Sequence, residues 1–265
     1  MPSPFENATA VERVGEHTYL ARIPDGWQQG RGAFGGVVLG TLARAMIASE
    51  PDPARTLRML SGEICGPVLA EEARLEVTVL RRGKNLTNLD ARMFQGGEVV
   101  ARASAGLSTP RSTAGDVRNP PPPARKPIEE ALSVTLPSPP APVFAKHYAF
   151  SVTGPLPFSG GSEPVVHGYV RERVAPDALD APAIIGLLDA HWPALFSVHT
   201  APRPMATAGF AAELLVDPRT LDPTRPLFYR GEAVAQRDGF FVEMRELWSD
   251  DVLVALNQQT FAILA

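Results

Sequence analysis

Two segments of the chain are apolar on every side at the period of an α-helix, and runs of alternating apolar and polar residues follow each of them. The first segment, 32–46, reads GAFGGVVLGTLARAM, and the second, 181–196, reads APAIIGLLDAHWPALF. A helix without a polar face has to be buried on every side. Each segment therefore predicts a central helix with a sheet wrapped around it.

The strand-like runs follow the two helices in the same order, which indicates an internal repeat. Alternation such as ARLEVTVL at 73–80 is typical of strands with one buried face. The runs lie at 73–82, 86–95 and 98–108 in the first half, and at 205–216, 229–236, 240–248 and 252–264 in the second. A helix followed by a meander of strands predicts an α+β fold with antiparallel sheet, present twice.

A proline-rich stretch, NPPPPARKPIEEALSVTLPSPPAPV at 119–143, divides the two halves. Proline fixes φ and removes a hydrogen-bond donor, so this stretch predicts an extended spacer. Its recurring apolar residues favour an ordered crossover packed on the surface over a disordered tether. We therefore expect an N-terminal unit at 1–117, a crossover linker at 118–145 and a C-terminal unit at 146–265.

Composition narrows the class of protein. The chain has 265 residues, of which 45% are hydrophobic and 20% charged, and its formal net charge is −4. This acidic balance argues against a nucleic-acid partner, and no apolar run reaches the roughly 18–20 residues of a membrane span. The N-terminus lacks a basic start and an apolar stretch, so we expect no signal peptide, and the single Cys65 fits a reducing compartment. We expect a cytoplasmic protein that is not bound to a membrane.

Asp189 is the most informative side chain, because it lies inside a helix that otherwise looks buried. Burying an ionised carboxylate is costly unless it is paired or hydrogen-bonded, so Asp189 is either exposed at one edge of the helix, satisfied by polar neighbours, or poised for chemistry. The matching helix of the first half, 33–49, contains no acidic residue, and its one charge is Arg44.

Polar residues on two strands belong with Asp189. Thr207 sits at the start of the strand that begins at 205, where a β-branched strand residue is the common structural role. In the last strand, VLVALNQQTFAIL, alternation places Asn257 and Gln259 on the face of its apolar residues. A buried amide needs hydrogen-bond partners, so these residues are candidates for the same polar cluster.

These motifs resemble the acyl-CoA thioesterase II type, the TesB-like family of double-hotdog thioesterases. FGGVVLG at 34–40 is similar to the FGGQVVGQA helix of that family, and LRRGKNL at 80–86 is similar to its LRxGxxF turn. The resemblance runs from about Trp27 to Leu264. It implies a double hotdog, in which two antiparallel sheets are each wrapped around a central apolar helix.

The resemblance also implies a catalytic set and a reaction. The Asp, Thr and Gln of the family fall on Asp189, Thr207 and Gln259. The family often follows its Thr with an aliphatic residue and Asp-His, whereas residues 208–211 here read Ala-Gly-Phe-Ala, which puts rate and substrate in doubt more than fold. The implied reaction is hydrolysis of an acyl-CoA to free acid and CoA by an activated water, without metal or cofactor. No G-x-S-x-G nucleophile motif is present.

Two further groups are candidates for substrate contacts. Gly35 and Gly36 open the first-half helix, where backbone N–H groups stabilise an oxyanion, although close helix–sheet packing is an equal explanation. Arg81, Arg82 and Lys84 form the densest basic cluster, which suits either a solvated turn or the phosphates of CoA.

Two rival functions stay open. One is a hotdog dehydratase or hydratase, but its H-x-x-x-G-x-x-x-x-P pattern is absent at all five histidines, which also lack metal-ligand spacing. The other is a non-catalytic protein that binds acyl-CoA or an acyl chain. The absence of the Asp-His leaves this alternative open. Oligomeric state is not predicted, although exposed sheet edges commonly pair.

Overall fold

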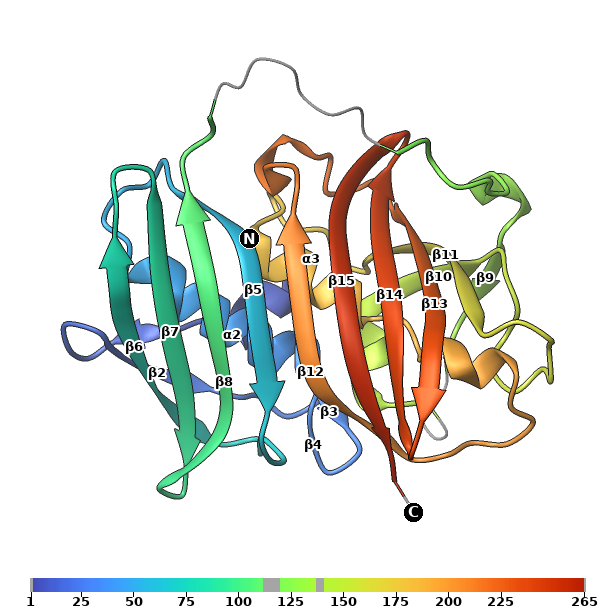
Figure 1. The fold of residues 1–265 in the computed structure, drawn as a ribbon, viewed down its shortest axis with the longest axis horizontal. Coiled ribbons are helices and arrows are strands. Elements are labelled where there is room, and N and C mark those ends of the chain that lie inside the picture. Colours follow the sequence, from blue (N-terminus) through green and yellow to red (C-terminus); the bar gives the residue numbers. More distant parts are fainter. Residues whose placement is uncertain (1, 112–119, 137–140, 265) are drawn as a thin grey trace.

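The computed structural model describes residues 2–111, 120–136 and 141–264. Within them, thirteen strands form one antiparallel sheet in the order β1-β2-β6-β7-β8-β5-β12-β15-β14-β13-β11-β10-β9 (Figure 1). The first half contributes six strands: β1 (Glu12–Arg13), β2 (Thr18–Arg22), β5 (Thr56–Ile64), β6 (Glu72–Arg82), β7 (Leu86–Gln95) and β8 (Glu98–Ser108). The second half contributes seven: β9 (Leu132–Val134), β10 (Tyr148–Val152), β11 (Val165–Glu172), β12 (Met205–Leu214), β13 (Leu227–Arg237), β14 (Phe240–Ser249) and β15 (Val252–Ile263).

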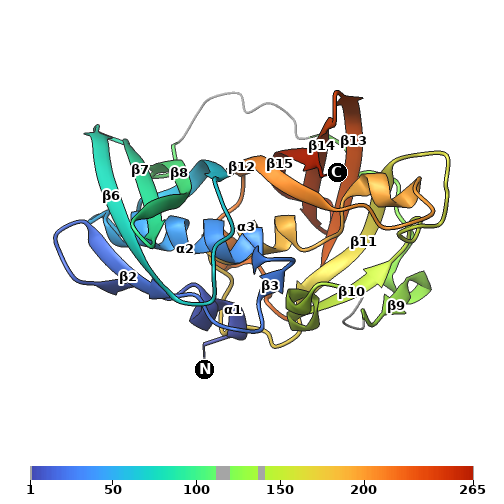
Figure 2. The ribbon, with the colours of Figure 1, turned by 90° about the horizontal axis from the view of Figure 1, so that it is seen from below.

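The sheet curls around two apolar helices, α2 (Gly35–Ala48) and α3 (Ala181–Asp189), which lie side by side under its concave face (Figure 2). The two helices come close together at a pair of glycines. A Cβ at Gly36 would lie 2.9 Å from the Cα of Gly186 on the other helix, and a Cβ at Gly186 would meet the side chains of Phe5 and Tyr148, so neither position has room for a side chain. This close crossing brings the N-terminus of α2 beside the last residue of α3.

The order of strands confirms the duplication expected from the sequence. The order β2-β6-β7-β8-β5 around α2 corresponds to β11-β13-β14-β15-β12 around α3, with each helix preceding the strand at the inner edge of its half. The expectation of two separate sheets was wrong in one respect. The inner edges pair through β5 Met59–Gly62 and β12 Phe210–Glu213, which joins the halves into one continuous sheet. This pairing satisfies two edges that would otherwise be exposed.

The second helix is shorter than expected from the sequence. The expected helix spans 181–196, but α3 ends at Asp189 and a separate 3-10 turn, η3 (Ala194–Ser197), follows it. Proline lacks an N–H and disfavours a helical conformation at the preceding residue. Pro193 therefore breaks the helix, and the break leaves Asp189 at a helix end.

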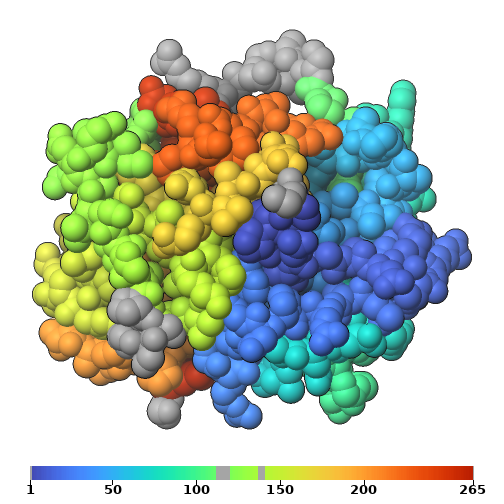
Figure 3. All heavy atoms as spheres, turned by 180° about the vertical axis from the view of Figure 1, so that it is seen from behind, coloured from blue at the N-terminus to red at the C-terminus, as the bar shows by residue number. Residues whose placement is uncertain are grey.

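The N-terminal segment closes the side of the molecule opposite the sheet. The short helix α1 (Pro4–Ala8) packs against both α2 and α3, and in Figure 3 the N-terminal residues, in dark blue, lie at the seam between the halves. Ser3 caps the helix: its Oγ accepts from Glu6 N, and Glu6 Oε2 accepts from Ser3 N. Phe5 is fully buried at this junction, so α1 helps to hold the helices together.

The proline-rich crossover packs along the second half. In its described part, β9 pairs with β10, and Arg125 Nη2 lies 3.0 Å from Asp251 Oδ1 in the turn between β14 and β15. Residues 118, 119 and 137–140 of the expected linker fall outside the described residues, and the linker boundaries at 118 and 145 stay a prediction. No helix within the three described ranges is both long and apolar enough to span a membrane.

Candidate active site

Three polar side chains from separate elements meet under the sheet. Gln259 Nε2, from β15, donates to Asp189 Oδ1 over 2.9 Å and to Thr207 Oγ1 over 2.7 Å. Asp189 is 7% exposed and Gln259 is fully buried, whereas Thr207 is half-buried at the start of β12. The structure thus brings together the three residues that the sequence singled out, with Gln259 as the bridge between the other two.

The alternation of β15 places Gln259 in this position. Asn257, Gln259 and Phe261 are buried on the inner face of the strand, while Gln258 between them is exposed. Asn257 has a different task, because its Nδ2 donates to Ala211 O on β12 over 2.8 Å and so ties neighbouring strands together. Of the two buried amides, only Gln259 bonds to Asp189.

The N-terminus of α2 forms the other side of the site. The backbone N–H of Gly36 donates to the Asp189 carboxylate, and no side chain caps the helix at Phe34. A carboxylate is favoured at the positive end of a helix dipole. A Cβ at Gly35 would lie only 2.7 Å from Asp189 Oδ2, so a glycine is required here for the carboxylate to approach the helix.

Opposing effects set the charge of Asp189. Burial raises the pKa of its carboxyl above the ordinary value, and the nearby Glu243 carboxylate acts in the same direction. The Arg245 guanidinium, the Gln259 amide and the Gly36 N–H favour the ionised form and lower the pKa. A buried carboxylate with a raised pKa, hydrogen-bonded to an amide that also reaches a hydroxyl, suits a group that takes a proton from water.

Two charged residues at the site were not singled out from the sequence. Glu243 and Arg245 on β14 are fully buried, with exposed fractions of 0% and 1%. Their signal was present in the alternation of the strand: both share the inward face with Phe241 and Leu247. Charged residues in phase with the apolar side of a strand must find partners inside the protein.

Comparison with known proteins identifies the family. The model of the acyl-CoA thioesterase N-terminal domain matches residues 23–108, and that of the acyl-CoA thioesterase C-terminal domain matches residues 119–263. The chain belongs to the acyl-CoA thioesterase family. Membership makes it a thioester hydrolase and confirms the resemblance found in its sequence. No curated protein matches the sequence.

Solved structures show that this thioesterase has the hotdog fold. A conserved protein of unknown function with a hot dog fold from Alicyclobacillus acidocaldarius has a TM-score of 0.91 at 22% identity, covering 100% of this chain and 99% of the other. A candidate thioesterase II from Thermobifida fusca YX has a TM-score of 0.86 at 24% identity, covering 100% and 98%. The acyl-CoA thioesterase II TesB2 from Mycobacterium marinum has a TM-score of 0.76 at 19% identity, covering 98% of each chain.

The two halves of the thioesterase separate beside the site. The pairing of β5 with β12 stops at Gly62 and Phe210. Beyond that point β5 continues to pair with β8 through Ile64, and β12 continues to pair with β15 through Thr207 and Met205. The half-buried Thr207 therefore lies on a strand end that no longer bonds to the first half.

The basic cluster lies away from Asp189. Arg82 Nε is 3.3 Å from Oε2 of Glu50, which follows the C-terminal end of α2, while Arg55 Nη2 donates to the backbone carbonyls of Gly83 and Lys84. The 14 residues of α2 span about 21 Å at 1.5 Å per residue. The structure therefore does not bring Arg81, Arg82 and Lys84 together with the catalytic candidates.

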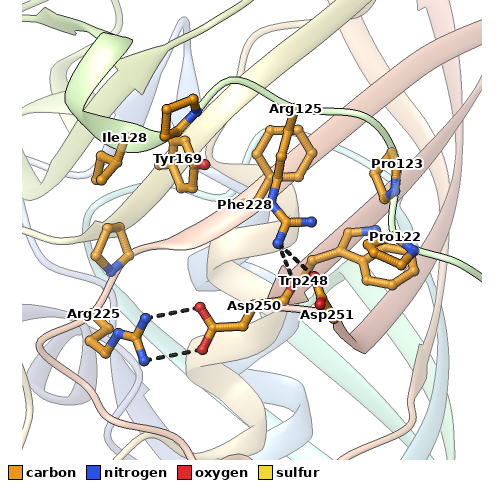
Figure 4. A pocket seen from close by; sticks show the side chains of 12 residues that line it. Pro122, Pro123, Arg125, Ile128, Tyr169, Arg225, Phe228, Trp248, Asp250 and Asp251 are labelled. Atoms are coloured by element: carbon orange, nitrogen blue, oxygen red, sulfur yellow. Dashed lines mark hydrogen bonds and ion pairs between the residues drawn. The ribbon is translucent and has the colours of Figure 1, made fainter.

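A separate pocket of about 550 Å³ lies between the crossover and β13, β14 and β11. Phe228 and Trp248 form part of its lining, with Arg125 above the Phe228 ring (Figure 4). Its charges are already engaged, since Arg225 pairs with Asp250 through both carboxylate oxygens. Phe228 precedes Tyr229, which bonds to Glu243 on the concave side. Because successive strand residues point to opposite faces, the pocket lies across the sheet from Asp189.

Proposed function

We propose that the protein hydrolyses an acyl-CoA to a free acid and CoA, using one water molecule held by Asp189, Gln259 and Thr207. The observation that carries this proposal is the bond of Gln259 Nε2 to both Asp189 Oδ1 and Thr207 Oγ1. A carboxylate accepts a proton, and a hydroxyl both donates and accepts hydrogen bonds. Together these groups are able to orient a water molecule and raise its nucleophilicity.

The proposed reaction follows from this arrangement. The water oxygen attacks the thioester carbonyl carbon as Asp189 takes one of its protons, and the carbonyl oxygen becomes an oxyanion. The C–S bond then breaks, the acid is released, and the CoA thiolate takes up the proton. Because the Gly36 N–H already donates to Asp189, we assign the oxyanion to the N–H of Gly35 at the positive end of α2.

The basic cluster can contribute to the binding of CoA but not to the reaction itself. Arg81, Arg82 and Lys84 lie at the opposite end of α2 from Gly35, with Arg82 paired to Glu50. Because they lie at the far end of α2 from Asp189, a contact with the phosphates of CoA would affect substrate affinity alone.

The surroundings of Asp189 favour hydrolysis over dehydration. A dehydratase needs a histidine to move a proton at carbon, and the histidine nearest in sequence is His191. Its ring stacks on Tyr229 with centroids 4.2 Å apart, and burial lowers the pKa of its imidazole to about 3. Neither of its ring nitrogens has a hydrogen-bond partner among the described residues, so it is not coupled to Asp189 as an acid–base pair.

Binding without turnover is the second candidate, because residues 208–211 lack the Asp-His that often follows the Thr of the family. Free-thiol release from short, medium, long and aryl acyl-CoAs separates the two. We expect release from at least one of them, with and without a metal chelator. Binding of an acyl-CoA with no release across the panel would establish the binding protein instead.

Asp189→Asn tests the role of the carboxylate. The amide keeps the size of the side chain and removes its basicity, so kcat should fall by roughly 10²–10⁴, while KM changes little because the loss falls on the transition state. Gln259→Ala and Thr207→Ala should each lower kcat, and less than additively with Asp189→Asn, since all three act on one water. Asp238→Asn, at an exposed turn, is the matched control. Normal kcat in folded Asp189→Asn would refute the assignment.

A further inference from the structure

A buried ion pair fastens the segment that follows Asp189. Arg245 Nε donates to Glu243 Oε1 over 3.0 Å, and Arg245 Nη1 donates to the Leu188 carbonyl, also over 3.0 Å. Glu243 Oε2 accepts from the backbone N–H of Ala194 over 2.8 Å. The pair therefore bonds to the chain on both sides of the break between α3 and η3, at the residue before Asp189 and at the first residue of η3.

The bond to Leu188 has a clear structural reason. The last carbonyls of a helix have no partner within the helix, and a cation at this end is favoured by the helix dipole. Arg245 supplies both the donor and the charge to the C-terminal end of α3. Since Asp189 is the last residue of α3, the guanidinium fixes the backbone that carries the carboxylate.

Arg245 also faces the carboxylate itself. Its Nη1 lies 3.5 Å from Asp189 Oδ1, the same oxygen that accepts from Gln259. Both ions are buried, and in such a site an opposite charge has a large effect on the ionisation of its neighbour. Glu243 lies on the far side of the guanidinium, where it holds Arg245 and adds a second negative charge.

The tyrosines and the histidine around Asp189 do not change charge between the pKa of His191 and neutral pH. Burial is the main cause that raises the pKa values of Tyr148 on β10 and Tyr229 on β13 well above 10. Burial and the Arg245 charge hold the pKa of His191 at about 3. Gln259, Thr207 and Gly36 complete the surroundings without titrating. An acid-side titration of this site therefore reports on its carboxylates.

We propose that Glu243 and Arg245 are positioning residues: Arg245, held by Glu243, keeps Asp189 ionised and directs its Oδ1 toward Gln259. The proposal deepens the hydrolase function and rests on it. Neither residue touches the proposed water, and both act through Asp189. The pair explains how a carboxylate buried at the junction of two helices stays available as a base.

Two substitutions should move the titration of Asp189 in opposite directions. Arg245→Met removes the counter-charge and should raise the pKa of Asp189 by about 1–3 units, so the acid limb of the kcat/KM profile moves to higher pH. In Glu243→Gln the amide oxygen still accepts a hydrogen bond from Arg245, so Arg245 stays in place while a like charge is removed, and that limb should move to lower pH. Loss of packing alone would not give shifts of opposite sign. Arg230→Met, an Arg on β13 that pairs with Glu232, is the control and should shift neither way.

The same titration can be read without activity. The ¹³C signal of the Asp189 carboxyl, assigned by its absence in Asp189→Asn, should shift its midpoint in the same directions. If Arg245→Met is recovered only unfolded, Glu243→Gln and Arg245→Lys decide: the lysine keeps the charge and should preserve the midpoint, while kcat falls because one ammonium cannot reproduce the fork of a guanidinium. A midpoint that Glu243→Gln leaves in place or raises overturns the proposal.

The two proposals fail in different ways. Shifted carboxyl titrations in a protein that releases no thiol from any acyl-CoA would defeat the hydrolase function and leave the ion pair as the control of Asp189 ionisation. Thiol release together with a midpoint that the variants do not move would overturn the role of the pair and leave the hydrolase standing.

Discussion

Glu172→Gln is expected to stabilise the protein increasingly as pH rises from 5 to 8. Glu172 ends β11 and is 4% exposed. Burial raises the pKa of its carboxyl to about 7 from an ordinary 4.5, helped by the carboxylates of Asp180 and Glu6, while the Ser3 hydroxyl and the Arg44 guanidinium oppose the shift. Between pH 4.5 and about 7, the folded protein therefore holds a proton at Glu172 that the unfolded chain has released.

The sign and size of the effect follow from this difference. A carboxyl with a raised folded pKa contributes stability that is fully present below about pH 4.5 and is lost as pH rises through about 7. The shift of 7 − 4.5 = 2.5 units corresponds to about 3 kcal/mol at high pH, of which about 0.8 kcal/mol is already lost at pH 5. Glutamine does not ionise, so the variant escapes this loss.

Urea unfolding at several pH values between 5 and 8 measures the effect. The free energy of unfolding of Glu172→Gln relative to the parent should grow by about 2–3 kcal/mol across this range, on top of a constant offset from the changed hydrogen bonds. Glu98→Gln, at the exposed start of β8, is the matched control and should show no such trend. A difference between Glu172→Gln and the parent that is independent of pH would show that Glu172 is already ionised in the folded protein.

Two predictions concern the site directly. Gly35→Ala would place a Cβ 2.7 Å from Asp189 Oδ2 and should lower kcat by about 10²-fold, because the carboxylate is misplaced. Gly66→Ala is the control: nothing lies within 4 Å of its Cβ, so kcat should not change. Equal kcat in the two variants would show that Asp189 tolerates the displacement. Calorimetric titration of a non-hydrolysable acyl-CoA analogue should give one productive site per chain, because α2 carries no acidic residue; two equivalent sites would contradict this asymmetry.

The features that were readable from the sequence are those set by local periodicity. The all-round apolar segments became α2 and α3, and the alternation of β15 placed Gln259 inward and Gln258 outward. The same reasoning applied to β14 would have found Glu243 and Arg245, since both share the inward face with Phe241. Charges on an apolar strand face are therefore as informative as a charge in an apolar helix.

Other features depend on contacts between distant parts of the chain. The pairing of Met59–Gly62 with Phe210–Glu213 joins edges about 150 residues apart, and alternation within either strand says nothing about which edge it meets. The basic residues at 81–84 also show that the sequence does not give the distance between two groups. Their charge was evident from the sequence, but their distance from Asp189 follows from the direction of α2, which places Glu50 and Arg82 at the end remote from Gly35.

The geometry of the site also explains why two halves are needed for one carboxylate. Asp189, Thr207 and Gln259 all come from the second half, but the backbone N–H that faces Asp189 comes from Gly36 in the first. Aligning Gly36 with Gly186 puts the fully buried Leu39 at the place of Asp189. The second half thus supplies the charged groups, while the first supplies the N-terminus of an apolar helix that no side chain caps. Because that end reaches Asp189 only where the helices cross, neither half alone contains all the groups that bond to Asp189.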